Sequence, residues 1–355
     1  MRYRLSARRA CLILTCLSLA APLSSCGQKS DVITPAHTKP FTVMLDFFPN
    51  ADHAALYSAI DNGYFRAAGL DVKPETPSNP AEPLQLLAAG KVDMAISYEP
   101  ELLLARDQGL KLVSIAALVQ RPLTSIIALP GKHVSKVSDL AGKRVGTAGI
   151  NYQAAELKTV LRKAGVNPQS VTETNVGYDL VAAMLSGKVD ATLGGFWNYE
   201  VLQLQLMGKH PVVIPVDQAG VPTYNELVLV VRENEAHRDG QDLRAFMAAL
   251  TRGERQVKAN PAAAAQQIVN ANPQLNSAPE KKLQLDSIEK TLAAAYPSNA
   301  SQPYGYQEPK AWASFARWMF SEGLLHTNPA TLSQPFTDEF LPGQGLGEKS
   351  EEETF

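Results

Sequence analysis

The strongest constraint on the fold of this chain is a pattern that occurs twice. Residues 86–97 predict the end of a helix, a glycine stop and a short buried strand, and residues 184–194 predict the same succession. Both copies contain the tetrapeptide Gly-Lys-Val-Asp, at 90–93 and at 187–190. A glycine after the last helical residue supplies a positive φ, and the apolar run that follows begins a strand. The duplication indicates two similar α/β units.

The segments before the two copies repeat as well. A strand-like run at 41–46 precedes a helix at 51–62, and a strand-like run at 143–147 precedes a helix that ends at residue 164. Strands that alternate with helices favour parallel sheets. About 300 residues are too many for one comfortable core. We therefore expect two doubly wound lobes rather than two halves of one sheet.

The rest of the chain is predicted to be helical. Helical patterns occur at 241–259, 262–270, 279–295 and 308–320, with prolines near their ends. We expect residues 40–125 to form the first lobe, 126–225 the second, and 226–342 to return to the first lobe and continue as helices. The expected fold class is thus α/β, with two doubly wound lobes, a ligand cleft between them and a helical C-terminal third. Its hinges would lie near 124–129 and 224–231.

The N-terminus has the features of an export signal. Four arginines precede a short apolar run at 10–21, which is too short to span a bilayer. The run ends in Leu-Ser-Ser-Cys at 23–26, which resembles the bacterial lipobox, where cleavage precedes an acylated cysteine. We expect residues 1–25 to be a lipoprotein signal peptide, Cys26 to be lipidated, and 26–39 to be a flexible tether. The alternative is an ordinary signal peptide with an incidental cysteine.

This interpretation places the chain in the cell envelope, anchored to a bacterial membrane at its periplasmic or outer face. At the other end, residues 343–355 contain four glutamates and predict a disordered tail.

Cysteine content and charge exclude several functions. The chain has 3 Cys, and the other two, Cys11 and Cys16, fall inside the signal. A mature domain that starts at Cys26 therefore has no intrachain disulfide, no thiolate zinc site and no cysteine nucleophile. Loss of the signal removes four Arg and no acid, which moves the formal charge from −2 to −6. Lys and Arg are scattered, so nucleic acid is not an expected partner. We expect no cofactor and no metal.

Four loops are candidates for a ligand site. In open α/β sheets the ligand lies beyond the carboxyl ends of the strands, which selects residues 46–53, 97–101, 146–152 and 194–200. These loops are rich in aromatic and polar residues and contain no Lys or Arg, which favours a flat, partly polar ligand over a strongly anionic one. The segment at 224–226 could add a lid. The candidate ligand-binding residues are Asp46, Phe47, Asn50, His53, Tyr57, Ser97, Tyr98, Glu99, Tyr152, Phe196, Trp197, Glu200 and Tyr224.

Each candidate also has a purely structural interpretation. Asp46 and Asn50 are residue types that cap turns and helices, and a histidine in a first helical turn is more often structural than catalytic. Phe47 and Trp197 could belong to the core. Taken singly, Glu99, Glu200 and Glu226 are expected to be solvated surface acids.

Several motifs resemble those of the thiamine-pyrimidine-synthase-like family of transporter substrate-binding proteins. They are Leu-Asp-Phe-Phe-Pro-Asn at 45–50 with His53 and Tyr57, Gly-Tyr-Phe at 63–65, Ala-Ala-Gly-Lys-Val-Asp at 88–93, Asp-Leu-Ala-Gly-Lys-Arg-Val-Gly at 139–146, and Gly-Gly-Phe-Trp-Asn-Tyr-Glu at 194–200. The resemblance covers residues 41–231. It implies a type II periplasmic-binding-protein fold that closes on thiamine-precursor pyrimidines.

The resemblance also implies residue roles. The family's stacking aromatic falls on Phe47, where the family usually has Trp. Its neighbouring polar contact falls on Asp46, and its second-lobe carboxylate on Glu200.

The expected function is capture of a pyrimidine precursor of thiamine by hinge closure, on behalf of an ABC importer. The expected partners are this small molecule, an ABC permease and its ATPase, and the membrane through the lipid anchor; the chain is expected to be a monomer. One alternative is a binder of riboflavin or of an alkanesulfonate or nitrate-type ligand. A second is a pyrimidine-synthesising enzyme, in which His53 with Asp46 or Glu99 would do acid–base work. A non-transport lipoprotein, such as a chemoreceptor partner, would use the same fold.

Overall fold

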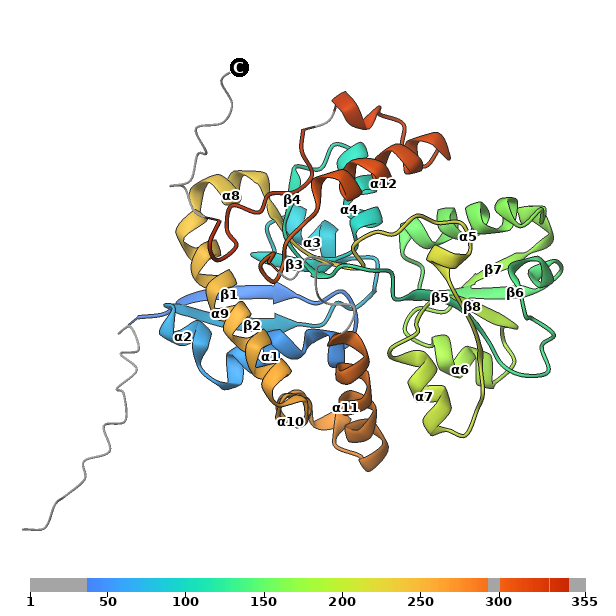
Figure 1. Cartoon of the computed structure of the whole chain (residues 1–355), viewed down its shortest axis with the longest axis horizontal. Coiled ribbons are helices and arrows are strands. Elements are labelled where there is room, and N and C mark those ends of the chain that lie inside the picture. Colours follow the sequence, from blue (N-terminus) through green and yellow to red (C-terminus); the bar gives the residue numbers. More distant parts are fainter. Residues whose placement is uncertain (1–36, 293–300, 332, 345–355) are drawn as a thin grey trace, which may run out of the picture. The chain divides into compact units, whose positions relative to one another are not determined.

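The computed structural model describes residues 37–292, 301–331 and 333–344, and two five-stranded sheets organise them. The first sheet has the order β2-β1-β3-β10-β4 and defines what we call the first lobe (Figure 1). In it, β1 is parallel to β2 and β3, whereas β10 is antiparallel to β3 and β4. Its strands are β1 (Lys39–Met44), β2 (Leu70–Glu75), β3 (Met94–Ser97), β4 (Leu112–Val119) and β10 (Leu227–Arg232).

The second sheet repeats the plan with the order β7-β6-β8-β5-β9 and defines the second lobe. Here β6 is parallel to β7 and β8, whereas β5 is antiparallel to β8 and β9. Its strands are β5 (Thr124–Ala128), β6 (Arg144–Thr147), β7 (Thr172–Asn175), β8 (Ala191–Phe196) and β9 (Val212–Pro215). The predicted fold class, α/β with two similar lobes, is confirmed.

The expected parallel pairing is found for β1 with β2 and β3 and for β6 with β7 and β8, but it is wrong for β5 and β10. Each is the first strand after the chain crosses from one lobe to the other. Thr124, at the start of β5, pairs with Phe196, at the end of β8. Val228 of β10 likewise pairs with Ser97, at the end of β3. A strand that enters a sheet at the carboxyl ends of its neighbours runs opposite to them.

Helices cover both sheets, as Figure 1 shows for α1 and α9 beside β1 and β2. The helices are α1 (Ala54–Asp61), α2 (Tyr64–Ala67), α3 (Pro83–Ala88), α4 (Glu99–Asp107), α5 (Asn151–Lys163), α6 (Leu180–Leu185), α7 (Glu200–Leu206), α8 (Glu233–Arg238), α9 (Gly240–Ala259), α10 (Pro261–Ala271), α11 (Ala278–Leu292) and α12 (Pro309–Ser321). Short 3₁₀ turns are η1 (Ala51–His53), η2 (Val137–Leu140), η3 (Pro168–Ser170), η4 (Val216–Gln218), η5 (Pro273–Leu275) and η6 (Pro329–Thr331).

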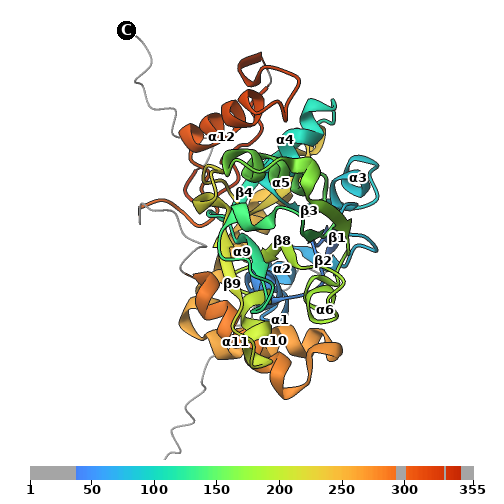
Figure 2. The same cartoon turned by 90° about the vertical axis from the view of Figure 1, so that its right-hand side faces the viewer.

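The C-terminal third is helical, as predicted, and packs on the first lobe, while α11 also contacts α7 of the second lobe. The ring of Phe246 on α9 lies 5.3 Å from that of Phe41 on β1 and 4.7 Å from that of Phe65 on α2, measured between centroids. Gly253 lets α9 approach α1 closely, because a Cβ there would lie 2.8 Å from the Cβ of Ala59. Helix α10 packs against α1 and α11 (Figure 2).

Two short segments, 120–123 and 219–226, connect the lobes. The predicted hinge ranges fall mostly on β5 and β10, directly after these segments. The carboxylate of Glu226 joins the two crossovers. It accepts hydrogen bonds from the backbone N–H groups of Leu123 (2.6 Å) and Thr124 (2.8 Å) and from the hydroxyl of Thr124 (3.0 Å).

Several predictions concern residues outside the described ranges. These are the signal peptide, lipidation at Cys26, most of the tether, residues 293–295 of one expected helix, and most of the C-terminal tail. Among the residues that the structure describes, none of the helices is long and apolar enough to cross a membrane.

Candidate functional site

A small pocket lies where the predicted loops of the two lobes meet. Its volume is about 20 Å³. That space holds about one water molecule. None of its described lining residues is Lys or Arg, so its walls offer aromatic rings, amides and carboxylates. They are Asp46, Phe47, Asn50, Tyr98, Ala148, Ile150, Gln153, Leu180, Gly194, Phe196, Tyr199 and Glu200.

The carboxylate of Asp46, just after β1, is held by two buried side chains. The backbone N–H of Asn50 donates to Nδ1 of His53 (3.2 Å). Because Nδ1 accepts this bond, the ring proton sits on Nε2. That nitrogen donates to Oδ1 of Asp46 (2.8 Å), and the hydroxyl of Tyr98 donates to Oδ2 (2.7 Å). Asp46 is therefore fixed in orientation at the pocket wall, while His53 lies behind it and does not line the pocket.

Asn50 caps the start of η1, as its structural interpretation predicted, and it also lines the pocket. Its side-chain oxygen accepts from the backbone N–H of Asp52 (2.8 Å) at the start of η1. The same turn brings the His53 ring back to the Asn50 backbone, which fixes the first-lobe wall.

Glu200 provides a second carboxylate, from the first turn of α7. Its Oε2 accepts from the backbone N–H of Phe196 (2.7 Å), and the residue is 7% exposed. Burial raises the pKa of Glu200 to about 7, and the negative charges of Asp52 and Asp46 add to the rise. The expectation of a solvated acid is wrong here, because α7 begins inside the interface between the lobes.

Aromatic rings from both lobes surround Phe47. Its ring centroid lies 4.6 Å from that of Phe48 and 4.6 Å from that of Tyr178, a residue of the second lobe. Phe48 in turn lies 5.9 Å from Tyr199, whose hydroxyl accepts from the side chain of Gln284 on α11 (3.0 Å). These contacts, with the hydrogen bond from Asn198 to Asp52 (2.7 Å), join the lobes around the pocket.

Sequence reasoning missed Gln153. Its Oε1 accepts from the backbone N–H of Ala148 (2.8 Å), which turns the amide into the pocket wall. Gly194 makes this possible, since it has φ 109° and a Cβ there would lie 2.9 Å from Cδ of Gln153. Glycine alone adopts such a φ without strain and leaves this space free. Two sequence features could have identified Gln153: the Gly-Gly pair at the end of β8, and its position directly after the selected loop at 146–152. Leu180 and Tyr199 were also absent from the predicted set.

The structure brings six of the thirteen predicted residues to this pocket: Asp46, Phe47, Asn50, Tyr98, Phe196 and Glu200.

The other seven lie elsewhere and have structural contacts. His53 supports Asp46, Tyr57 packs in a cluster with α10 and α11, and Tyr152 lies 5.4 Å from Tyr98 between ring centroids. The hydroxyl of Ser97 donates to Glu101 (2.6 Å), and the indole N–H of Trp197 donates to the carbonyl of Pro122 (3.0 Å).

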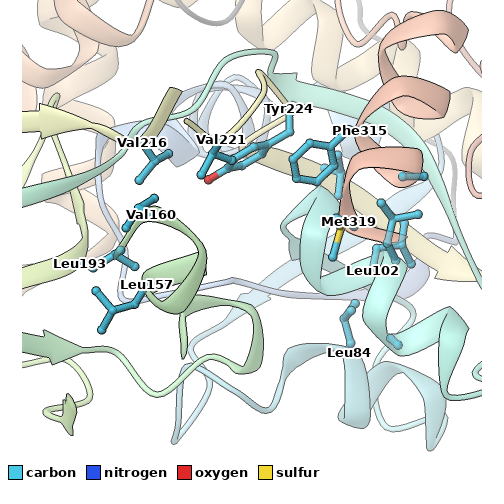
Figure 3. Packing of buried hydrophobic residues seen from close by; sticks show 14 of the residues in the cluster. Leu84, Leu102, Leu157, Val160, Leu193, Val216, Val221, Tyr224, Phe315 and Met319 are labelled. Carbon is cyan, nitrogen blue, oxygen red and sulfur yellow. The ribbon is translucent and has the colours of Figure 1, made fainter. Parts of the chain in front are cut away.

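Tyr224 and Glu99 differ most from expectation. Tyr224 is no lid, because it is 2% exposed and its ring lies 4.9 Å from that of Phe315 in a cluster shared by both lobes, the crossover and α12 (Figure 3). Glu99 is fully buried rather than solvated, and its Oε2 accepts from the backbone and side-chain N–H groups of Asn225 (2.8 and 2.7 Å).

Glu99 belongs to a group of four buried acids near the crossovers, with Glu101, Glu156 and Glu226. Among the described residues none of the four makes an ion pair with Lys or Arg. Burial therefore raises the pKa of Glu99 to about 8, and those of Glu101 and Glu226 to about 7. The pKa of Glu156 is raised by burial and by the nearby Glu226. Within the described part of the chain, no three His, Cys, Asp or Glu residues are grouped to hold a metal ion.

Comparison with known proteins identifies the family. The family model described as NMT1/THI5 like matches residues 50–264. A second match is the formylaminopyrimidine-binding protein of Halalkalibacterium halodurans, 36% identical over 78% of this chain and 83% of that protein. The chain belongs to the NMT1/THI5-like family.

Other proteins similar to this chain carry different names. The putative thiamine biosynthesis protein of Haemophilus influenzae is 34% identical over 80% of this chain and 87% of its own length. A 4-amino-5-hydroxymethyl-2-methylpyrimidine phosphate synthase of Saccharomyces cerevisiae, THI13, is 24% identical over 68% of this chain and 73% of its own.

Solved structures show the fold. The alkanesulfonate-binding protein SsuA of Xanthomonas axonopodis pv. citri superimposes with a TM-score of 0.64 at 18% identity, covering 82% of this chain and 96% of that one. A Candida albicans protein described as having the generic periplasmic binding protein fold gives a TM-score of 0.60 at 17% identity, covering 82% and 92%. The predicted periplasmic-binding-protein fold is confirmed.

Proposed function

We propose that this NMT1/THI5-like protein is the substrate-binding component of an ABC importer and captures a pyrimidine precursor of thiamine. The observation that carries the proposal is the pocket between the lobes. Asp46 and Glu200 face it from opposite lobes, Phe47 and Tyr199 supply rings, and its described lining has no cation. The name of the Halalkalibacterium halodurans relative, a formylaminopyrimidine-binding protein, supports this ligand class.

The pocket chemistry matches an aminopyrimidine. The exocyclic amino group has two N–H donors, and the carboxylates of Asp46 and Glu200 are acceptors. The ring has π faces that can stack on Phe47. A sulfonate or nitrate is typically bound by Lys, Arg or clustered backbone N–H groups, and the described lining contains no Lys or Arg, so the anionic alternatives are disfavoured.

Ligand exchange requires the lobes to part. Small-molecule pockets usually measure at least roughly 300 Å³. The space found here is far smaller. The lobes are joined by two short crossovers, and Glu226 links one crossover to the other by hydrogen bonds. A ligand that contacts both lobes would favour the closed arrangement over the open one.

An enzymatic role is less well supported than binding. The yeast relatives carry synthase names, but the two nitrogens of His53 are engaged by Asn50 and Asp46, and the ring does not line the pocket. A general acid or base must lie within hydrogen-bond reach of the reacting group. Incubation with candidate substrates followed by mass spectrometry distinguishes the two, since a binder returns its ligand unchanged.

The cellular setting is part of the same proposal. Cleavage before Cys26 and acylation of its thiol would anchor a monomeric binding protein to a bacterial membrane, beside the permease and ATPase that it serves. The periplasmic-binding-protein fold of the structural neighbours supports an exported location.

Ligand binding can be tested with a defined panel. We expect thermal unfolding to shift upward with 4-amino-5-aminomethyl-2-methylpyrimidine and its N-formyl derivative, and not with thiamine, riboflavin, taurine or nitrate. Calorimetric titration then gives the dissociation constants. Stabilisation by the anions alone would show that the pyrimidine proposal is wrong.

A further inference from the structure

Tyr178 of the second lobe contacts the first lobe beside the pocket. It lies in the loop between β7 and α6, and its hydroxyl donates to the backbone carbonyl of Pro77 in the first lobe (2.6 Å). The turn before it is set locally, because Gly177 has φ 55° and its N–H donates to Oδ1 of Asn175 (2.9 Å). Tyr178 is therefore a positioned side chain.

The ring of Tyr178 packs against the proposed stacking residue. Its centroid is 4.6 Å from that of Phe47 with an interplanar angle of 66°, and 6.1 Å from that of Phe48. Phe47 is thus surrounded by protein rings, and the pocket beside it holds about one water molecule. A six-membered ring needs more space, so one of these contacts must open before a ligand can stack on Phe47.

Tyr178 is the contact best placed to open. Phe47 and Tyr98 are buried, whereas Phe48 and Tyr178 are partly exposed. Of these two partly exposed rings only Tyr178 belongs to the second lobe, so it leaves Phe47 when the lobes part. The hydrogen bond from the Tyr178 hydroxyl to the carbonyl of Pro77 joins the two lobes. Burial, with the charges of Asp46 and Glu82, raises the pKa of Tyr178 to about 12, so the hydroxyl remains a donor well above physiological pH. Two residues later, Leu180 already lines the pocket.

We propose that Tyr178 is the gate and a specificity-determining residue of this pocket: its contacts with Phe47 and Pro77 hold the lobes together without ligand, and its ring limits the size of the ligand that the closed form accepts. The size limit rests on the proposed function, whereas the gate does not. Opening breaks the bond to Pro77 and withdraws the ring from Phe47, and closure over a small pyrimidine restores the bond. A bulkier ligand keeps Tyr178 from closing.

The effect of Tyr178 on the opening of the lobes can be measured without any ligand. Spin labels at Lys91→Cys and Lys188→Cys, two exposed and equivalent positions of the repeated motif, report the distance between the lobes by double electron–electron resonance. The three natural cysteines are replaced by serine in the full chain. We expect Tyr178→Phe, which removes only the hydroxyl, to increase the open population about threefold to tenfold. Tyr64→Phe, on α2 away from the pocket, serves as the matched control.

Ligand selectivity tests the size limit. In wild type, 4-amino-5-aminomethyl-2-methylpyrimidine should bind more tightly than thiamine, which carries an additional ring. We expect Tyr178→Ala to reduce the ratio of the two dissociation constants at least about tenfold, and Tyr178→Phe to leave it unchanged because the ring remains. Circular dichroism and thermal unfolding check that each variant folds.

The outcomes separate the two proposals. Unchanged distance distributions in both Tyr178 variants would overturn the gate, and an unchanged ratio in Tyr178→Ala would overturn the size limit. A wild-type chain that binds no pyrimidine, but whose Tyr178→Phe variant opens, would overturn the proposed function and support the gate.

Discussion

The Nε2 of His53 lies 2.8 Å from Oδ1 of Asp46, and neither side chain has meaningful contact with solvent. The imidazole is held from its other side by the backbone of Asn50, so the pair behaves as one rigid unit at the end of β1. Asp46 faces the ligand pocket, and its hydrogen bond with His53 determines the orientation of its carboxylate.

Loss of His53 should therefore weaken ligand binding without removing any group that touches the ligand. We expect His53→Ala to cost about 1–3 kcal/mol of stability, because Asp46 loses a buried donor, and to raise the dissociation constant about tenfold or more. Thermal unfolding and calorimetric titration measure the two effects. His237→Ala, at an exposed position on α8, is the control and should change neither. Wild-type affinity in His53→Ala would show that Asp46 needs no such support.

Binding should depend on pH through Glu200. Its raised pKa of about 7 means that the carboxylate gains a proton, and loses an acceptor, as the pH falls below neutrality. We expect affinity for the aminopyrimidine to rise between pH 6 and pH 8 in wild type. Glu200→Gln removes the titration, so its affinity should be lower at pH 8 and flat across this range. Calorimetric titration at several pH values checks this, and a slope that persists in Glu200→Gln would assign the titration to another group.

Stability should fall at alkaline pH because of the buried acids near the crossovers. The folded-state pKa of Glu99, about 8, lies above its ordinary value of 4.5, so the protonated form stabilises the fold. This contribution is fully present below pH 4.5 and is lost as the pH rises through about 8. Glu99→Gln resembles the protonated acid and should have a higher melting temperature than wild type at pH 9, by the equivalent of roughly a few kcal/mol, but not at pH 5. Equal melting temperatures at pH 9 would contradict this account.

The close crossing of α9 and α1 should tolerate no side chain at Gly253. A methyl group there would lie 2.8 Å from the Cβ of Ala59. We therefore expect Gly253→Ala to destabilise the protein by about 1–3 kcal/mol. Alanine normally favours a helix over glycine, so the sign itself is informative. Denaturant unfolding measures the change, with Gln256→Ala on the exposed face of α9 as the control.

Most of the fold could be predicted from the sequence because the same pattern of helix, glycine and strand occurs in both lobes. The Gly-Lys-Val-Asp copies mark β3 and β8, which occupy equivalent places in the two sheets. The antiparallel direction of β5 and β10 could not be predicted, because an apolar run predicts a strand but not whether that strand pairs parallel or antiparallel with its neighbours. That direction is determined by where the chain enters the sheet after a crossover.

The site was partly predictable for a similar reason. The strand-end rule found Asp46, Tyr98 and Glu200. It was applied to four loops only, and the loop after β7, which ends at the same edge because β7 is parallel to β6, was left out. Tyr178 lies in that loop.

The burial of Glu99 was not predictable from its neighbours in the chain, because its partner Asn225 is 126 residues away. A loop acid is normally solvated, and only the folded chain provides the amides that replace water. The same applies to Glu226 and the N–H groups of Leu123 and Thr124.

The place of β10 in its sheet also bears on the order in which the protein is assembled. β10 lies between β3 and β4, so the first sheet stays divided until the ribosome has made residue 232. All strands of the second sheet lie within residues 124–215 and are complete earlier. The lobe whose first strands are synthesised earliest is therefore the lobe whose sheet can be completed last.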